Sequence, residues 1–561
     1  MNFSETLHRV ANDFPQQPAL IEVTGRASGH SATPAHRRIT YAELNALADR
    51  YACGFRRVGV RRGDRALFLL KPGIEFYGAI YGLLRVGAVV VLIDPGMGLR
   101  GLLRCVSDIR PRVVVAVSAV HAVGVLASAA LRRAEIRITD GSRWFWGGPT
   151  LSACRDAAER SSRSDAPQQP RDVCYADSDE AVIAFTSGST GPAKPVLFTH
   201  GMLHAQAAAI GHDFGWEPAT TMVMCFPGFV PPVLANGLTA VLPQIDFARP
   251  AAVPPERMLE AIIGLHAQCA FASPSIWENL TRYCERHKIQ LATLQDALTT
   301  GAPVSLGMHS RFRRVCPGGE LHTPYGATEA MPLTTISTSQ LLSHGRAGTL
   351  AGKGTCIGRP LSGVDLRIIR IVEQPIATWT DQLLVAPGEI GEIVVGGPVV
   401  SSRYVDRPQA NAETKIRDNG RVLHRTGDMG LRDEDGRIWF CGRVAHRVVS
   451  DAGMLPPVAV EGPLNEHPLV FRTALVGVCH DGAPASTPVV CVQMEQGTTL
   501  SPQIVRELVQ RLAGTPWQGR VTRFVQHPGF PTDLRHNSKI RREILAQWAQ
   551  SKFAANHLHE V

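Results

Sequence analysis

A loop of hydroxyl, glycine and lysine residues stands out at 185–194, which reads Phe-Thr-Ser-Gly-Ser-Thr-Gly-Pro-Ala-Lys. Glycines let backbone N–H groups come close to phosphate oxygens, and hydroxyls add further hydrogen-bond donors. The apolar run 181–185 has the composition of a buried strand. The loop therefore leaves a sheet where α/β folds bind ligands, which predicts a site for the phosphates of ATP. The predicted phosphate ligands are Thr186, Ser187, Gly188, Ser189, Thr190, Gly191 and Lys194.

The phosphate loop that ends in Gly-Lys-Ser/Thr and opens into a helix does not fit this segment. Lys194 follows Pro192 and Ala193 and precedes Pro195. Because prolines on both sides disfavour the start of a helix, we expect an extended loop after the strand. A Ser/Thr/Gly linker without a ligand is the alternative.

Four further stretches have residue types suited to nucleotide chemistry. They are 300–303 (Thr-Gly-Ala-Pro), 325–329 (Tyr-Gly-Ala-Thr-Glu), 425–428 (Arg-Thr-Gly-Asp), and Gly-Arg at 442–443 followed by Asn-Ser-Lys-Ile at 537–540. Together with the loop they resemble, in type and order, the adenylate-forming superfamily of acyl-CoA synthetases, luciferases and peptide-synthetase adenylation domains. The resemblance covers nearly the whole chain.

That resemblance implies an α/β fold with two parts. A large N-terminal domain at 1–441 would layer parallel and mixed sheets with helices, and would include a β-rich subdomain at about 340–441. A small, mobile α+β lid at 442–561 would rotate on a hinge just after Arg443.

The resemblance also implies roles for individual residues. The loop would hold the β- and γ-phosphates, Thr328 would contact the α-phosphate, and Glu329 with Thr186 would bind Mg²⁺. Tyr325 would stack on adenine, and Asp428 would accept hydrogen bonds from the ribose hydroxyls. The implied nucleotide-binding set is completed by Gly301, Ala302, Pro303, Gly326, Ala327 and Arg443.

Lys539 has its role from the resemblance alone. It would move in with the lid and bridge the carboxylate and the ribose or α-phosphate, where a point charge stabilises the transition state. Taken singly, Tyr325 is also readable as a core aromatic, Asp428 as a turn residue and Glu329 as a surface acid. The implied catalytic residues are Lys194, Thr328, Glu329 and Lys539.

Lysine usage supports this interpretation. Only seven of the 58 Lys and Arg residues are lysines, and two of the seven are Lys194 and Lys539. A chain that uses arginine almost everywhere else indicates that these two positions need a compact, flexible ammonium group.

The composition is that of a globular protein with several domains. A chain of 561 residues with 44% hydrophobic content is too long for one core. Arginines are spread without a basic block, so nucleic-acid binding is not supported, and the net charge of +9 suits ATP and carboxylates. The 12 cysteines form no Cys-x-x-Cys pair, which argues against a zinc site and a disulfide framework. Because no basic-then-apolar leader opens the chain, we expect a cytoplasmic protein.

Alternating signals for strands and helices predict parallel sheets covered by helices. Helical spacing spans 44–58, and strand patterns span 65–70 and 88–93. The uncharged stretch 113–131 is close to membrane-spanning length, but its β-branched start favours a strand followed by a helix, so no transmembrane segment is expected. A polar segment at about 155–171 predicts a surface connection, and Asp-Asn-Gly at 418–420 predicts a turn.

At two places this chain departs from the sequence pattern of many superfamily members, which narrows the subfamily that it resembles. Many relatives have an acidic residue two positions after the Gly-Arg pair, where this chain has Ala445 and then His446. The segment 453–457 (Gly-Met-Leu-Pro-Pro), which leads to Glu461, lacks an arginine that is common in acyl-CoA synthetases. That segment helps to shape the thiol tunnel of thioester-forming members, so the departure argues against transfer to CoA.

The phrases at 92–98, 146–151, 354–358 and 529–537 resemble the β-lactone synthetases of bacterial long-chain olefin biosynthesis. This closer resemblance implies that ATP and Mg²⁺ activate a 2-alkyl-3-hydroxy fatty acid, whose own β-hydroxyl then displaces AMP. Effective concentration replaces an external nucleophile in such a ring closure. A fatty-acyl-CoA ligase and an inactive acyl- or nucleotide-binding scaffold are the alternatives, and other enzymes of a hydrocarbon pathway are possible partners.

Two smaller assignments concern the acyl substrate. His446 is a candidate general base, against the alternative of a structural or solvent-facing histidine. Aromatic residues are candidates for an acyl pocket, against the alternative of core packing. These aromatics are Phe226, Phe229, Phe271 and Trp277.

Overall fold

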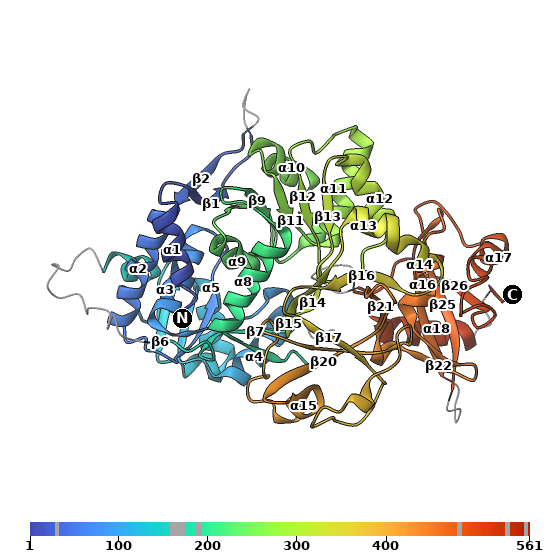
Figure 1. The fold of residues 1–561 in the computed structure, drawn as a ribbon. Coiled ribbons are helices and arrows are strands. Elements are labelled where there is room, and N and C mark those ends of the chain that lie inside the picture. The colour runs from blue at the N-terminus through green and yellow to red at the C-terminus, as the bar shows by residue number, and fades with distance from the viewer. Residues whose placement is uncertain are drawn as a thin grey trace. The chain divides into compact units, whose positions relative to one another are not determined.

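The structure, a computed structural model, describes residues 1–27, 33–157, 174–186, 192–479, 485–532, 539–554 and 559–560. The chain divides into two compact units, and Figure 1 shows the order of their elements. Unit 1 comprises Met1–Ala272, Thr328–Met331 and Pro398–Asn411, and unit 2 comprises Ser273–Ala327, Pro332–Gly397 and Ala412–Val561. The chain thus passes from one unit to the other inside the 325–329 stretch. The lid boundary at 441/442 stays a prediction.

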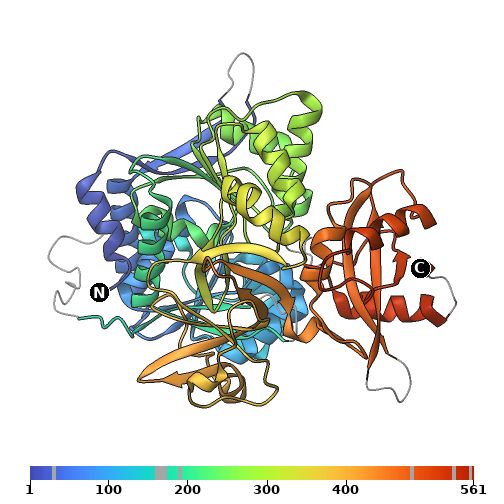
Figure 2. The same ribbon diagram turned by 45° about the vertical axis from the view of Figure 1, so that its right-hand side comes forward.

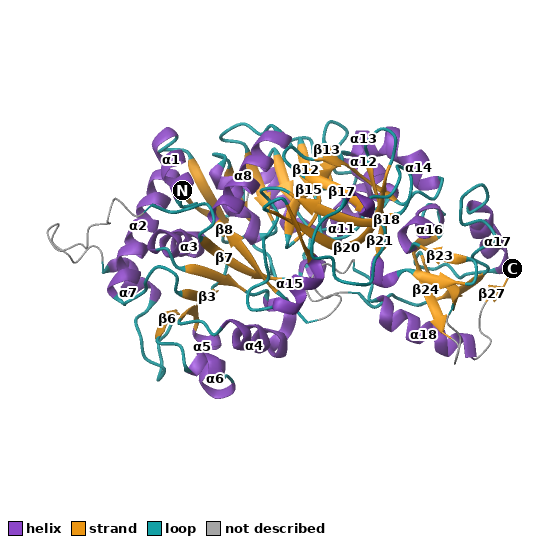
Figure 3. Ribbon diagram, turned by 60° about the horizontal axis from the view of Figure 1, so that its bottom comes forward, coloured by secondary structure: helices purple, strands orange, loops and turns teal. Residues whose placement is uncertain are grey.

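Unit 1 contains a six-stranded sheet of order β6-β5-β3-β4-β7-β8. Its strands pair in parallel, except that β8 runs antiparallel to β7. Helices α2 and α3 lie on one side of this sheet and α4, α5 and α6 on the other (Figure 3). Strands buried on both faces explain the Val-, Ile- and Leu-rich runs. The bounds are β3 (Arg65–Leu69), β4 (Val89–Leu92), β5 (Val113–Val117), β6 (Ile136–Asp140), β7 (Glu180–Phe185), β8 (Pro195–Thr199), α2 (Tyr41–Arg57), α3 (Ile74–Val86), α4 (Gly98–Ile109), α5 (Ser118–Ala127) and α6 (Ala129–Arg132).

Unit 1 also holds five adjacent strands of a second sheet, in the order β11-β9-β10-β1-β2. Only β2 runs antiparallel to its neighbour. The bounds are β1 (Pro18–Val23), β2 (His36–Thr40), β9 (Thr221–Met224), β10 (Thr239–Leu242), β11 (Cys269–Phe271), α1 (Glu5–Asp13), α7 (Leu151–Asp156), α8 (His200–Phe214), α9 (Val230–Ala235) and α10 (Pro255–Gly264).

Several predicted elements are confirmed. The expected helix at 44–58 is α2, and the strand patterns at 65–70, 88–93 and 181–185 are β3, β4 and β7. The stretch 113–131 is a strand followed by helices, as expected. Among the described residues, no helix is both long and apolar enough to cross a membrane. Most of the polar segment at 155–171 lies outside the described residues.

Unit 2 contains a sheet with the path β14-β15-β16-β21-β20-β18-β17, in which β14 spans Tyr325–Ala327 and β19 pairs with β20. The pairs from β15 to β17 are antiparallel. The predicted turn at 418–420 joins β19 to β20, with positive φ at Asn419 and Gly420 as a tight hairpin requires. The bounds are β15 (Ala330–Thr335), β16 (Thr355–Pro360), β17 (Asp365–Ile369), β18 (Gly391–Gly396), β19 (Lys415–Asp418), β20 (Arg421–Arg432) and β21 (Ile438–Arg443).

The other helices and short strands of unit 2 come before these strands in the chain or between them. The parallel strands β12 and β13 pair with each other. The bounds are β12 (Asp296–Leu298), β13 (Glu320–His322), β14 (Tyr325–Ala327), α11 (Pro274–His287), α12 (Leu306–Val315), α13 (Thr338–Gln340), α14 (Arg346–Leu350) and α15 (Pro408–Thr414), the last of which begins in unit 1.

The last part of unit 2 is a four-stranded sheet of order β24-β25-β26-β27 with helices around it (Figure 2). Alternate side chains of β24 face opposite ways: Leu475 packs in one core with α16 and α17, whereas Ala474 and Val476 pack in another with α18. The bounds are β22 (Val448–Ser450), β23 (Gly453–Leu455), α16 (Pro457–Leu464), β24 (Val470–Cys479), β25 (Ser486–Met494), α17 (Pro502–Arg511), β26 (Arg523–Gln526), α18 (Arg542–Ala554) and β27 (His559–Glu560).

Gly358 is a position where the fold requires glycine. It interrupts the register of β16 with β21, its φ is +83°, and a Cβ there would overlap the carbonyl oxygen of Thr335. We expect Gly358→Ala to lower the free energy of unfolding by about 2 kcal/mol, because positive φ strain and overpacking act together. The matched control is Gly436→Ala, which has a φ of +76° but open space around the position. Equal shifts of the urea midpoint for the two variants would contradict this account.

Candidate active site

The base of the predicted phosphate loop is closed by two hydrogen bonds. Strand β7 leads into the loop and β8 leaves it, so the loop joins two antiparallel strands. The backbone N–H of Thr186 donates to the Lys194 carbonyl, and the Lys194 N–H donates to the Thr186 hydroxyl, both at 3.0 Å. Extended chain after Lys194 confirms that no helix starts there. The predicted ligands Ser187, Gly188, Ser189, Thr190 and Gly191 lie outside the described residues.

Lys194 and Glu329 approach a common partner within unit 1. The Lys194 ammonium lies 5.2 Å from the centre of the Tyr404 ring, on its face. The Tyr404 hydroxyl donates to Oε1 of Glu329 at 2.6 Å. The structure therefore joins two predicted residues through a third that the sequence analysis did not select, since Tyr404 belongs to none of the five stretches.

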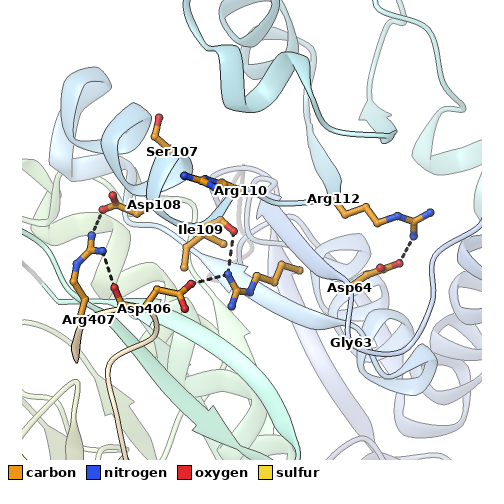
Figure 4. Close-up of a pocket in the computed structure, with 10 residues that line it drawn as sticks. Gly63, Asp64, Ser107, Asp108, Ile109, Arg110, Arg112, Asp406 and Arg407 are labelled. Carbon is orange, nitrogen blue, oxygen red and sulfur yellow. Dashed lines mark hydrogen bonds and ion pairs between the residues drawn. The ribbon is translucent and has the colours of Figure 1, made fainter. Parts of the chain in front are cut away.

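The segment that carries Tyr404 is fixed to the rest of unit 1. Arg65 pairs with Asp406 at 3.2 Å, and Arg407 pairs with Asp108. These side chains line a polar cavity of about 660 Å³ (Figure 4). None of the residues predicted for ATP lines that cavity. The ion pairs serve as an anchor for the chain on either side of Tyr404.

A second group of predicted residues meets in unit 2. The carboxylate of Asp428, which is only 6% exposed, accepts from the Tyr325 hydroxyl at 2.7 Å and pairs with Nε of Arg443 at 2.9 Å. Burial, and next the charge of Asp428, raises the pKa of Tyr325 well above its usual range, so the phenol stays a donor. Asp428 and Arg443 face each other across the antiparallel pair β20 and β21.

The turn at 300–303 also lies in unit 2. Gly301 has a φ of +102°, which glycine adopts without strain, and the Thr300 hydroxyl donates to the carbonyl of Pro324 at 2.8 Å. That bond ties the turn of Gly301, Ala302 and Pro303 to the residue just before Tyr325, which starts β14 with Gly326 and Ala327. Thr328 follows in unit 1, next to Glu329.

A known protein family matches most of this chain. The model of the "AMP-binding enzyme" family matches residues 7–405. The chain belongs to the AMP-binding enzyme family. The matched region contains the predicted site residues from Thr186 to Glu329, and it also contains Tyr404.

Two curated relatives of this AMP-binding enzyme match over nearly the whole chain. The olefin beta-lactone synthetase of Stenotrophomonas maltophilia is 36% identical over 557 residues, covering 98% of each chain. The olefin beta-lactone synthetase of Xanthomonas campestris pv. campestris is 37% identical over 559 residues, covering 98% of this chain and 97% of its own. Among solved structures, ATP-bound MatB from Rhodopseudomonas palustris matches with a TM-score of 0.76 at 21% identity, covering 99% and 100% of the two chains. The expected adenylate-forming fold is confirmed.

The C-terminal part of this AMP-binding enzyme holds Lys539 and His446. Lys539 is half-buried and precedes Ile540, which bridges to Thr532, so the residue sits where the backbone is fixed just before α18. His446 Nε2 lies 3.1 Å from Oε1 of Glu543. Burial, followed by the charge of Arg542, lowers the pKa of His446. Its role as a base stays a prediction.

The candidate acyl-pocket aromatics fall into two environments. Phe226, Phe229 and Phe271 form one cluster in unit 1, with ring centres 5.1–6.2 Å apart, and the first two are partly exposed. Trp277 is fully buried in unit 2, donates to the Leu298 carbonyl and packs edge-on against Phe312. Trp277 therefore packs in the core, as the alternative interpretation states, whereas the three phenylalanines remain candidates for an acyl pocket.

The residues present fit a metal ion that is bound mainly by a nucleotide. Within the described part of the chain, no three His, Cys, Asp or Glu side chains are grouped to hold a metal. Glu329 is half-buried, and among the described residues only Tyr404 hydrogen-bonds its carboxylate. Mg²⁺ is commonly held by one or two carboxylates together with substrate phosphates. A single carboxylate with one oxygen hydrogen-bonded to Tyr404 suits that arrangement.

Proposed function

We propose that this AMP-binding enzyme adenylates a long-chain 2-alkyl-3-hydroxy acid with ATP and then closes it to a β-lactone. The observation that carries the proposal is the likeness to two olefin beta-lactone synthetases over 98% of the chain. The two clusters of predicted residues support the use of ATP: Lys194 with Glu329, and Tyr325 with Asp428 and Arg443.

The first step joins two negatively charged partners. A carboxylate oxygen of the acid attacks the α-phosphorus of ATP, and the bond to pyrophosphate breaks. Neutralising charge and aligning the groups are therefore the main tasks of the protein. We assign the triphosphate to Thr186, the loop 187–191 and Lys194, and the α-phosphate to Thr328. Mg²⁺, when bound by Glu329, would neutralise phosphate charge.

The second step needs no further substrate. The β-hydroxyl oxygen attacks the carbonyl carbon of the acyl-adenylate, the carbon–oxygen bond to AMP breaks, and the hydroxyl proton passes to a base or to water. The proposal assigns this proton to His446, whose lowered pKa leaves the imidazole neutral and able to accept it. Because the nucleophile is part of the same molecule, its effective concentration is high.

The nucleoside would be held by the unit 2 cluster. Tyr325 would stack on adenine along the turn of Gly301, Ala302 and Pro303, with Gly326 and Ala327 beside it. Asp428 already receives two donors, and its carboxylate oxygens keep lone pairs for ribose hydroxyls. Arg443 holds Asp428 in place.

We expect Asp428→Asn to weaken ATP binding about 10- to 100-fold, since charge-assisted hydrogen bonds contribute about 1.5–3 kcal/mol each. The amide keeps the size of the carboxylate but turns one acceptor into a donor, which then faces Tyr325 or Arg443. Calorimetric titration with ATP measures the effect. The control is Asp381→Asn, an exposed aspartate of unit 2 whose carboxylate accepts from the indole N–H of Trp379. Unchanged affinity in Asp428→Asn would remove Asp428 from the proposed site.

Product analysis by mass spectrometry tests the function itself. The protein is incubated with Mg-ATP and a long-chain 2-alkyl-3-hydroxy acid, with and without CoA. A product lighter than the acid by one water, formed with AMP and without CoA, supports β-lactone synthesis. A thioester that forms only with CoA favours the alternative, a fatty-acyl-CoA ligase, and contradicts the proposal. Absence of AMP under both conditions, with every acid tested, would favour the inactive acyl- or nucleotide-binding scaffold.

A further inference from the structure

Tyr404 contacts both charged residues of the unit 1 cluster although it lies outside the recognised stretches. Its side chain is 2% exposed, its hydroxyl donates to Oε1 of Glu329 at 2.6 Å, and its ring face lies 5.2 Å from the ammonium of Lys194. A tyrosine used only for packing needs neither contact. One side chain thus contacts both a candidate metal ligand and a candidate phosphate ligand.

The backbone around Tyr404 is hydrogen-bonded to the segments that carry Lys194 and Glu329. Tyr404 forms a bridge with Val196, and the Val405 N–H donates to the carbonyl of Pro195 at 2.9 Å, directly after Lys194. On the other side, the Ser401 N–H donates to the Glu329 carbonyl at 2.7 Å. The segment therefore links the end of the phosphate loop to Glu329 through main-chain bonds.

Side chains fix the segment further. Asn411 accepts from the Tyr404 N–H at 2.7 Å and donates to its carbonyl at 2.9 Å, so both backbone groups of Tyr404 are satisfied. Beyond it, Asp406 and Arg407 enter the ion pairs around the polar cavity of Figure 4. A buried ring on a fixed backbone has little freedom, and such preorganisation places attached charges reproducibly.

We propose that Tyr404 is a positioning residue for the Mg-ATP site. Its hydroxyl occupies one oxygen of Glu329 and so presents the other oxygen to the metal, and its ring face holds the Lys194 ammonium toward the phosphates. Mg²⁺ accepts one oxygen of a carboxylate readily because it demands octahedral geometry with short bonds. The cation–π contact favours the charged ammonium without pairing it to a carboxylate, which leaves it available for phosphate. The inference rests on the proposed function.

The test compares ATP binding by calorimetry in Mg²⁺ and in EDTA, which needs no acyl substrate. Tyr404→Phe keeps the ring and removes the hydroxyl, so we expect about 10-fold weaker binding of ATP in Mg²⁺ and unchanged binding in EDTA. Tyr404→Leu also removes the ring, so binding should weaken in both conditions. The matched control is Tyr51→Phe, which deletes another buried hydroxyl that donates to a glutamate, Glu75, at a position unrelated to the predicted site.

A double-mutant cycle separates positioning from packing. Glu329→Gln removes the charge that Tyr404 orients, so adding Tyr404→Phe to it should cost nothing further in Mg²⁺. Additive losses, or a Tyr404→Phe loss that is equal in Mg²⁺ and EDTA, would overturn the assignment. If Tyr404→Phe does not fold, Tyr404→Leu is compared with Tyr51→Phe instead: its loss of ATP affinity should be larger in Mg²⁺ than in EDTA, and equal losses would overturn the assignment. A wild-type protein that binds no ATP in either condition would instead refute the proposed function, and the assignment with it.

Discussion

Replacing Lys539 with alanine should lower the rate of ATP–pyrophosphate exchange about 10²- to 10³-fold, the usual loss when one preorganised transition-state donor is removed. The reason is electrostatic. The acid and the triphosphate are both anionic, and the developing charge at the α-phosphorus needs a compact cation. ATP affinity should stay close to that of the wild type, because the nucleotide is assigned to the loop after β7 and to the Asp428 cluster.

The control for this variant is Lys552→Ala. Lys552 belongs to α18, in the same C-terminal part, and its ammonium lies 5.8 Å from the centre of the Trp548 ring. Both variants lose one positive charge, so a general effect of net charge would slow both equally. Normal exchange in Lys539→Ala, or an equal loss in Lys552→Ala, would refute the assignment of Lys539.

The parts of the site that follow from local sequence were predictable. Apolar residues before 186 indicate β7, and prolines around Lys194 disfavour a helix, so β7 and the extended chain after Lys194 follow from chain-local rules. The alternation along 44–93 likewise predicts α2, β3 and β4. Period-two and period-3.6 patterns depend on neighbouring residues, which a sequence displays directly.

Contacts between distant residues were not predictable in the same way. Tyr404 and Glu329 are 75 positions apart, and Asp428 and Tyr325 are 103 apart. The family resemblance identified Tyr325, Asp428 and Glu329 because their residue types occur in the order of the family motifs. No spacing rule indicates a role for a tyrosine at 404. Its only signal is indirect: a large aromatic in a polar stretch between Ser402 and Asp406.

Arg425 shows that a motif residue can serve the fold instead of the ligand. It stood in the 425–428 stretch without an assigned role. In unit 2 its guanidinium reaches Oε2 of Glu392 at 2.6 and 3.0 Å and also donates to the carbonyls of Val372 and Gln374. Both side chains of the ion pair are nearly inaccessible, at 10% and 3% exposure. The pair joins β18 to β20 three residues before Asp428, so it supports the strand that carries the proposed ribose ligand.

We therefore expect Arg425→Met to lower the free energy of unfolding by about 3–5 kcal/mol, since it leaves the Glu392 carboxylate buried without its partner. The shift of the urea midpoint measures the loss. Arg421→Met is the control on the same strand: its guanidinium is 66% exposed and lies 3.9 Å from Asp418, so it should cost less than about 1 kcal/mol.

The double variant Arg425→Met/Glu392→Leu distinguishes the cause of that loss. If the cost of Arg425→Met comes from an unpaired buried charge, removing the charge as well should recover most of the stability, because apolar side chains of similar volume replace buried ion pairs at little cost. The carbonyls of Val372 and Gln374 lose their donor in both variants, so recovery will be incomplete by that amount. If the double variant is as unstable as Arg425→Met alone, the loss comes instead from those carbonyls. Arg425 would then stabilise the protein by hydrogen-bonding the backbone at 372–374, and not by neutralising the charge of Glu392.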